Sequence, residues 1–98
     1  MNEQDQPKTR KLKALAQHLE PVLRVGKAGL SDAFLKSVDE ALDSHELLKI
    51  RFEEFKEEKK TLAPLLAEKT NSRLVTRIGN VVVLYREHKD PSRRRIKP

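Results

Sequence analysis

The stretch VLRVGKAGLSDAF, residues 22–34, joins a short strand to a helix through a turn that holds two of the chain's three glycines. Its first residues are mostly apolar or β-branched, as is typical of a strand. Ser31 is well placed to cap a helix, and the apolar residues that follow recur at helical spacing as far as Leu42. The GKAG turn, residues 26–29, is therefore predicted to link a strand to a helix that ends near His45.

Upstream of this stretch, the sequence predicts a helix that begins after Thr9 and is stopped by Pro21. Threonine is a favoured N-cap residue, and proline cannot continue a helix. The expected apolar stripe of this helix consists of Leu12, Leu15, Ala16 and Leu19. Downstream, ELLKIRF, residues 46–52, alternates between apolar and charged side chains and predicts a half-buried strand. Lys49 and Arg51 fall on the face of that strand away from the apolar residues.

The segment EEFKEEKKTLAPLLAEKTN, residues 53–71, is predicted to form a third helix. Pro64 lies inside it and removes a helical hydrogen bond, which predicts either a kink or a late start. Asn71 is expected to end the helix in a left-handed conformation.

The last part of the chain predicts a hairpin. The strands RLVTRI, residues 73–78, and VVVLYR, residues 81–86, are joined by Gly79-Asn80, a favoured two-residue turn. Because VVVLY does not alternate, we expect an inner strand covered on both faces. The order α-β-α-β-α-β-β predicts a single α/β domain with packed helices and a mixed four-stranded sheet. Its crossovers are expected to be parallel and right-handed, and its last hairpin antiparallel.

The charge is concentrated at the two ends of the chain. Residues 14–85 carry eleven basic and eleven acidic groups, whereas residues 1–13 carry a net +2 and residues 86–98 a net +4. Such ends favour a polyanionic partner, nucleic acid before membrane, although a solubilising tail has the same composition. We expect a domain over residues 9–87, between a flexible N-terminus, residues 1–8, and a flexible basic tail, residues 88–98.

Several classes of function find no support in the sequence. There is no cysteine, no apolar run long enough for a membrane span, and no apolar leader at the N-terminus, so the cytoplasm is the expected location. The three histidines lie on separate predicted elements, away from any nucleophile or set of metal ligands. We therefore expect no enzyme, cofactor, metal or small-molecule substrate. Only 4% of the residues are aromatic, which disfavours a base-stacking platform and leaves recognition of the nucleic-acid backbone.

The GKAG turn is a candidate for that recognition. A G-x-x-G pattern alone occurs by chance in roughly half of chains this long. This one precedes a helix, whose amides attract anions, and its glycines would let a phosphate backbone approach closely beside the charge of Lys27. A first helix of about 16 Å and a strand returning over about 13 Å would bring the turn beside Arg10, Lys11 and Lys13. From the residues alone, phosphate contact and plain turn formation both remain open.

A longer pattern resembles a known family. KALAQHLEPVLRVGKAGLSDAFLKSVDEALDSHELLKIRF, followed by RIGNVVVLYR, is similar to the CRM domain (chloroplast RNA splicing and ribosome maturation), especially to the stand-alone bacterial YhbY-like proteins, over residues 9–87. Asn71 stands where that family commonly has glycine. The resemblance implies a fold like the C-terminal domain of a bacterial translation initiation factor.

It also implies an RNA-binding module that associates with ribosomal RNA in precursors of the large ribosomal subunit. The implied contacts are the G-x-x-G loop and nearby basic residues. With the basic tail added, the expected RNA-binding residues are Arg10, Lys11, Lys13, Gly26, Lys27, Ala28, Gly29, Arg93, Arg94 and Arg95. The alternative function is a protein-interaction adaptor whose basic ends dock an acidic partner.

Overall fold

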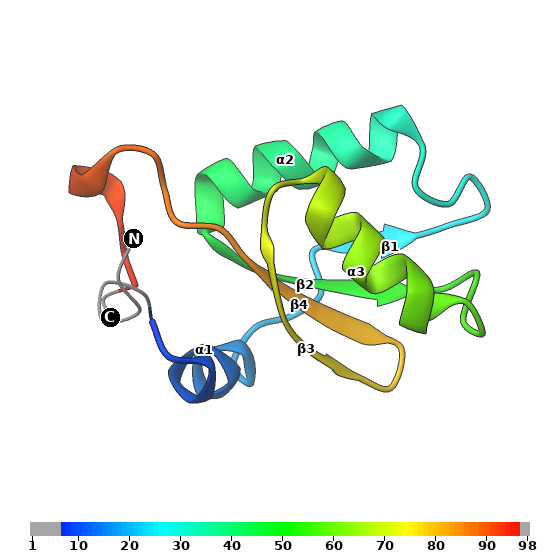
Figure 1. The fold of residues 1–98 in the computed structure, drawn as a ribbon, viewed down its shortest axis with the longest axis horizontal. Helices are drawn as coiled ribbons and strands as arrows, with labels where there is room; N and C mark the ends of the chain where they lie inside the picture. Colours follow the sequence, from blue (N-terminus) through cyan, green and yellow to red (C-terminus); the bar gives the residue numbers. More distant parts are fainter. Residues whose placement is uncertain (1–6, 97–98) are drawn as a thin grey trace.

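The helices and strands follow one another in the predicted order (Figure 1). The computed structural model describes residues 7–96. Its elements are α1 (Thr9–Ala16), β1 (Leu23–Val25), α2 (Asp32–His45), β2 (Leu47–Phe52), α3 (Lys59–Lys69), β3 (Arg73–Ile78), β4 (Val81–Tyr85) and the short 3₁₀ helix η2 (Pro91–Arg93).

The four strands form one mixed sheet in the order β1-β2-β4-β3. β1 pairs with β2 in parallel, and β4 pairs antiparallel with both β2 and β3. β4 therefore lies between β2 and β3, and β3 runs parallel to β2 without pairing with it. These pairings confirm the predicted mixed four-stranded sheet with its antiparallel hairpin.

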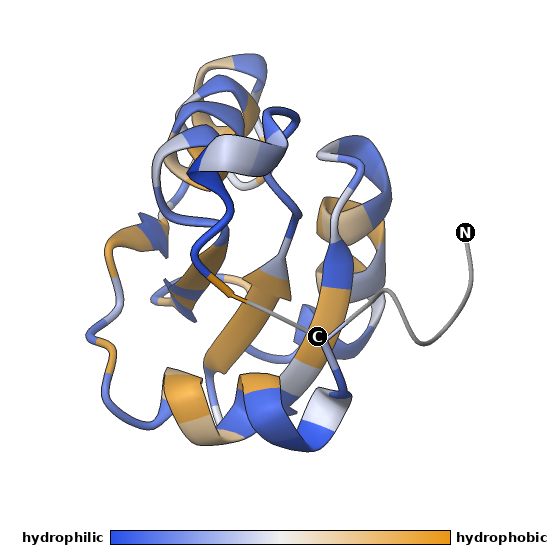
Figure 2. Cartoon of the chain, turned by 90° about the vertical axis from the view of Figure 1, so that its left-hand side faces the viewer, coloured by the Kyte–Doolittle hydropathy of each residue, from blue (hydrophilic) through white to orange (hydrophobic). Residues whose placement is uncertain are grey.

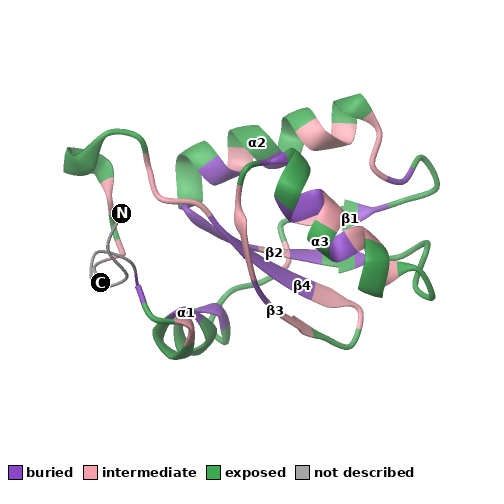
Figure 3. Ribbon diagram, viewed as in Figure 1, coloured by how far each residue is buried: buried purple, intermediate pink, exposed green. Residues whose placement is uncertain are grey.

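β4 is covered on both faces, as its unbroken run of apolar residues predicts. Val82 and Leu84 belong to the core cluster that α2 and α3 build on one face of the sheet. Val83 and Tyr85 belong to a second cluster, built with α1 on the other face. Figure 3 shows the buried parts of β2 and β4 at the centre of the molecule, and Figure 2 shows these hydrophobic strands between α1 and the other helices. Burial of apolar side chains on both sides of one sheet is the main stabilising contribution.

Local signals at the ends of the helices behave as predicted. The Ser31 hydroxyl accepts the Phe34 N–H at 3.2 Å, which caps α2. Asn71 has a φ of 50°, and the N–H groups of Asn71 and Ser72 donate to the carbonyls of Glu68 and Ala67 at 3.2 and 2.9 Å. This pair of hydrogen bonds is a Schellman motif, which satisfies the last carbonyls of α3.

The first helix is shorter than predicted. It ends at Ala16, where N–H groups further along bond three residues back instead of four, and Leu15 and Leu19 remain 39% and 37% exposed. Thr9 is also not the N-cap, because it is already helical. Its hydroxyl instead accepts a hydrogen bond from the guanidinium of Arg73 on β3.

The third helix starts late, one of the two outcomes that Pro64 predicts, and it contains Pro64. The expectation that residues 53–58 are helical is wrong. The N–H groups of Glu53 and Glu54 both donate to the Val25 carbonyl at 3.1 Å, so this segment is held beside the end of β1 as a loop.

The C-terminal segment also differs from the expectation of a flexible tail. Residues 88–96 lie against the domain, because the buried carboxylate of Glu46 accepts hydrogen bonds from the His88 and Arg95 backbones at 2.9 and 2.6 Å. At the other end, Pro7 is buried and its carbonyl accepts a hydrogen bond from Arg73 at 3.0 Å. The rest of the two predicted flexible ends, residues 1–6 and 97–98, lies outside the described residues.

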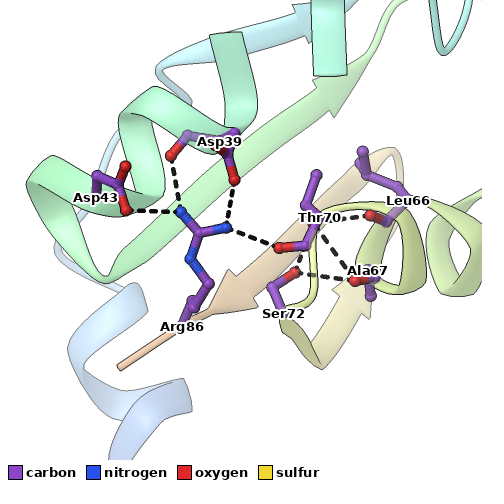
Figure 4. A network of polar contacts seen from close by, with 7 residues as sticks. All are labelled: Asp39, Asp43, Leu66, Ala67, Thr70, Ser72 and Arg86. Atoms are coloured by element: carbon purple, nitrogen blue, oxygen red, sulfur yellow. Dashed lines mark hydrogen bonds and ion pairs between the residues drawn. The ribbon is translucent and has the colours of Figure 1, made fainter. Parts of the chain in front are cut away.

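Arg86, directly after β4, connects both helices of the larger layer (Figure 4). Its guanidinium donates to the carboxylates of Asp39 and Asp43 on α2, at 2.5 and 2.9 Å, and to the carbonyl of Thr70 at the end of α3, at 2.8 Å. The Arg86 side chain is only 14% exposed, whereas the Asp39 and Asp43 side chains are 56% and 55% exposed, so these charge-assisted hydrogen bonds lie at the edge of the solvent.

Tyr85 supplies a test of the packing around β4. Its hydroxyl is buried and has no hydrogen-bond partner among residues 7–96. Burial, together with the nearby charges of Glu46 and Glu87, raises the pKa of Tyr85 from 10.0 to about 12. The folded chain therefore holds the phenolic proton more tightly than the unfolded chain, and this stabilisation is lost as the pH rises from 10 to about 12.

We predict that Tyr85→Phe raises the free energy of unfolding at neutral pH by about 1 kcal/mol, because it removes a buried polar group without a partner. The variant should also lose less stability than wild type between pH 10 and 12. Thermal unfolding over this pH range tests both statements. A lower melting temperature for the variant at neutral pH would show that the hydroxyl has a partner.

Candidate nucleic-acid interface

The GKAG turn is closed by a hydrogen bond from the Gly29 N–H to the Gly26 carbonyl, at 3.0 Å. The two glycines have different roles. Gly29 is buried, has a φ of +64°, and a β-carbon there would lie 3.2 Å from Cε2 of Phe55. Gly26 is exposed, and a β-carbon there would meet no atom within 4 Å. Only Gly26 therefore leaves the space that a phosphate backbone needs for close approach.

Three loops meet at the end of the molecule that contains the GKAG turn. Figure 1 shows the β1–α2 loop, the β2–α3 loop and the β3–β4 turn together at the right. Phe55 of the second loop covers Gly29 of the first. The Asn80 carbonyl in the hairpin turn accepts the Phe52 N–H at 2.7 Å, and the Asn80 amide oxygen accepts the Lys59 ammonium at 2.8 Å. Direct contacts thus join the GKAG turn to the β2–α3 loop, and hydrogen bonds join the hairpin turn to the residues on either side of that loop.

Lys27 is the exposed cation of this turn. Its ammonium has no hydrogen-bond or ion-pair partner among residues 7–96, and it lies shortly before the N-terminus of α2. Both signs of charge occur nearby, because residues 53–58 carry four glutamates and Asp32 opens α2. Glu53 is paired with Arg24, the Nε–Oε1 distance being 2.9 Å. Lys27 is therefore available to pair with a phosphate.

The basic residues of α1 do not lie beside the turn, so that prediction is wrong. Arg10, Lys11 and Lys13 are exposed on α1, which packs against the face of the sheet opposite to α2. β1 runs away from α1, so Figure 1 shows the GKAG turn at the far right and α1 in the left half of the molecule. The expected return of the chain does not occur, because α1 ends at Ala16 and an irregular segment, residues 17–22, separates it from β1.

Three other cations, Arg24, Lys49 and Arg51, lie on β1 and β2. The strand register pairs Arg24 of β1 with Arg51 of β2, and Lys49 follows on the same face of β2. This is the face that α1 covers in part. Lys49 and Arg51 also line a groove of about 360 Å³ with Gln17, Leu19, Glu20, Pro21, Ile78, Val81 and Val83. The alternation of residues 46–52 places both side chains on this face, but it does not identify them as part of a site.

Arg93, Arg94 and Arg95 lie at the opposite end of the molecule from the GKAG turn, beside the C-terminal end of α2 (Figure 1). The structure therefore separates the predicted basic residues into three regions. Arg24, Lys49 and Arg51 lie on the face of the sheet that carries α1, whereas the arginine segment lies at the opposite end of the molecule from the turn.

Residues 7–96 contain neither a metal-binding cluster nor a membrane-spanning helix. Within that range, no group of three or more histidines, cysteines or acidic residues could hold a metal ion. No helix among these residues is long and apolar enough to cross a membrane.

Comparison with known proteins gives consistent matches. The CRS1 / YhbY (CRM) domain family matches residues 5–86. The chain is 40% identical over 80 residues to the probable RNA-binding protein YqeI of Bacillus subtilis, a match that covers 81% of this chain and 83% of that protein. It is 30% identical over 89 residues to the probable RNA-binding protein PA4753 of Pseudomonas aeruginosa, covering 90% and 86%.

A solved structure has the same fold. The solution structure of the hypothetical protein SAV1595 from Staphylococcus aureus is 36% identical, covers 92% of this chain and 94% of its own, and gives a TM-score of 0.74. The small α/β fold described above is thus shared by this chain and that protein. The chain belongs to the CRS1 / YhbY (CRM) domain family, which confirms the resemblance seen in the sequence.

The two glycines of the turn should respond differently to substitution. We predict that Gly29→Ala lowers the free energy of unfolding by about 1–2 kcal/mol, because alanine is disfavoured at positive φ and its β-carbon would press on Phe55. Gly26→Ala should leave the stability unchanged to within about 0.5 kcal/mol. Chemical denaturation of both variants measures the difference, and equal losses would contradict the assigned roles.

Proposed function

We propose that this CRM-family chain binds the backbone of RNA, and that the exposed part of the GKAG turn, Gly26-Lys27-Ala28, is one contact. The observation that carries the proposal is the combination of an open glycine and an unpartnered lysine shortly before the start of α2. Backbone N–H groups at such a position attract phosphate, and the ammonium of Lys27 would add a charge-assisted hydrogen bond.

The remaining contacts would follow the face of the sheet that carries α1. Arg51 and Lys49 would lead from the turn towards Arg10 and Lys13, which are exposed and have no partner among residues 7–96. Lys11 is exposed on the same helix. A path of this kind reads charge rather than base sequence, since the only aromatic side chain at the loop end with substantial exposure, Phe55, packs its ring against Gly29.

The expected RNA is ribosomal, in precursors of the large subunit, as the family resemblance implies, and the expected location is the cytoplasm. Relatives that carry the name of probable RNA-binding proteins support RNA as the partner. The charge of the proposed path also supports RNA as the partner, because most of its side chains are exposed cations and RNA is a polyanion.

Sedimentation of a cell lysate through a gradient tests the ribosomal part of the proposal. At low salt, the protein should migrate with precursors of the large subunit, and treatment with ribonuclease should return it to the top. If the protein enters large complexes that survive ribonuclease, the partner is a protein and the adaptor function is favoured. If the protein remains at the top in untreated lysate, the ribosomal assignment fails.

Titration with RNA at several salt concentrations tests the turn itself. We predict that Lys27→Ala lowers the slope of log affinity against log salt by about one, because one phosphate contact is lost. Gly26→Val should weaken binding while it keeps every charge, because its side chain fills the open space. Lys69→Ala is the matched control, since Lys69 is exposed at the end of α3, on the other face of the sheet. Normal binding by Gly26→Val would mean that the turn does not contact RNA.

A further inference from the structure

Glu46 is a buried carboxylate at the end of α2 whose hydrogen bonds hold the C-terminal segment. It is only 1% exposed and has a φ of 60°. Its Oε2 accepts the His88 N–H at 2.9 Å, and its Oε1 accepts those of Arg95 and Ile96 at 2.6 and 3.4 Å. A buried carboxylate must be satisfied by donors, and here all of its donors in residues 7–96 come from one segment.

Further contacts give that segment a defined shape. Arg94 donates to the His88 carbonyl at 2.8 Å and pairs with Glu87 at 3.0 Å. The Asp90 carboxylate accepts the Ser92 N–H at 3.0 Å, which caps η2. Ile96 packs against the core cluster under α1. The segment is thus held at both ends, by Glu46 and by Ile96, with the three arginines between.

The arginines line a groove of about 580 Å³ together with Asp43, Ser44, His88 and Ser92. The Arg93 side chain is 73% exposed, and its nearest acidic oxygen, on Asp90, is 3.8 Å away. The Arg95 side chain is exposed, and its guanidinium has no partner among residues 7–96. Asp43 is occupied by Arg86. The groove therefore presents cations that are only partly neutralised, and guanidinium groups match phosphate in geometry as well as charge.

We propose that Glu46 fixes Arg93, Arg94 and Arg95 in place as a second phosphate-binding site for RNA. The inference rests on the proposed RNA-binding function and adds a separate location to it. The site lies at the opposite end from the GKAG turn in a molecule 37 Å long, so one chain would contact two separate segments of a folded RNA.

Fixing the arginines matters because a mobile tail must be ordered when it binds. Ordering a rotamer-rich side chain and its backbone opposes association, whereas a segment that is already held avoids most of that cost. A docked segment also presents its charges in one arrangement, which favours RNAs whose phosphates can meet both ends of the molecule. Glu46 is thus a positioning residue, since its carboxylate is buried beneath the segment that carries the arginines.

Two variants release the segment and keep all three arginines. Glu46→Gln replaces one acceptor oxygen by an NH₂ donor, so that at least one backbone N–H loses its partner. Ile96→Ser removes the apolar contact and leaves Glu46 intact. Glu40→Gln is the control, because it makes the same charge change on the exposed face of α2. Amide hydrogen exchange at His88 and Arg95 reports release, and thermal unfolding reports the fold.

Each variant is titrated with a folded transfer RNA, which can span both ends, and with a short RNA duplex that can cover only one. We expect both release variants to speed exchange at Arg95 and to weaken transfer-RNA binding roughly three- to tenfold, with duplex binding and the control unchanged. If amide exchange at Arg95 becomes faster but the affinity for transfer RNA is unaltered, the inference is wrong. It is also wrong if the exchange rate is unaltered in both variants. Wild-type protein that binds neither RNA would instead overturn the proposed function, and this inference with it.

Discussion

The burial of β4 on both faces is the constraint on which the other layers depend. A strand with Val82 and Leu84 on one side and Val83 and Tyr85 on the other needs apolar cover above and below. α2 and α3 supply one cover, and α1, although short, supplies the other. Because α2 and α3 follow β1 and β2 on the same face, the loops that precede them emerge at one end of the sheet, where the hairpin turn also lies (Figure 1). The candidate interface is a consequence of this arrangement.

At the opposite end, Glu46 and Arg86 hold several segments of the chain together through hydrogen bonds. The Arg86 N–H donates to the Glu46 carbonyl at 2.8 Å, so the two residues are tied through their backbones. The guanidinium of Arg86 joins α2 to the end of α3, and the carboxylate of Glu46 holds the chain that follows. Removing the Glu46 carboxylate would leave the N–H groups of His88 and Arg95 without their acceptor, and an unsatisfied buried donor is costly. Both ends of the molecule are thus held by contacts between segments that are distant in the sequence.

Features that depend on neighbouring residues could be predicted from the sequence. The element order, the cap at Ser31, the left-handed Asn71 and the Gly79-Asn80 turn all rest on patterns of a few residues. Features that depend on distant partners could not. Nothing near Glu46 in the sequence indicates that its carboxylate binds a segment some fifty residues later. Likewise, the contact of Phe55 with Gly29 joins two loops that are distant in the sequence. Because of this contact, Gly29 serves packing between the loops and leaves no space there for a phosphate. Lys27 and Gly26 could be proposed as contacts from the sequence because their turn is a local feature.

The position of β4 also has a consequence for how the protein is made. Synthesis delivers β1, β2 and β3 before β4, yet β4 is the strand that separates β2 from β3 in the sheet. A nascent chain that has not yet produced residues 81–85 lacks the strand that contributes to both core clusters. Without that strand, β2 and β3 cannot be joined in one sheet. Arg86 and the segment held by Glu46 come later still. Completion of this sheet is therefore deferred until residues 81–85 have emerged from the ribosome, and β3 and one edge of β2 have no strand to pair with until then.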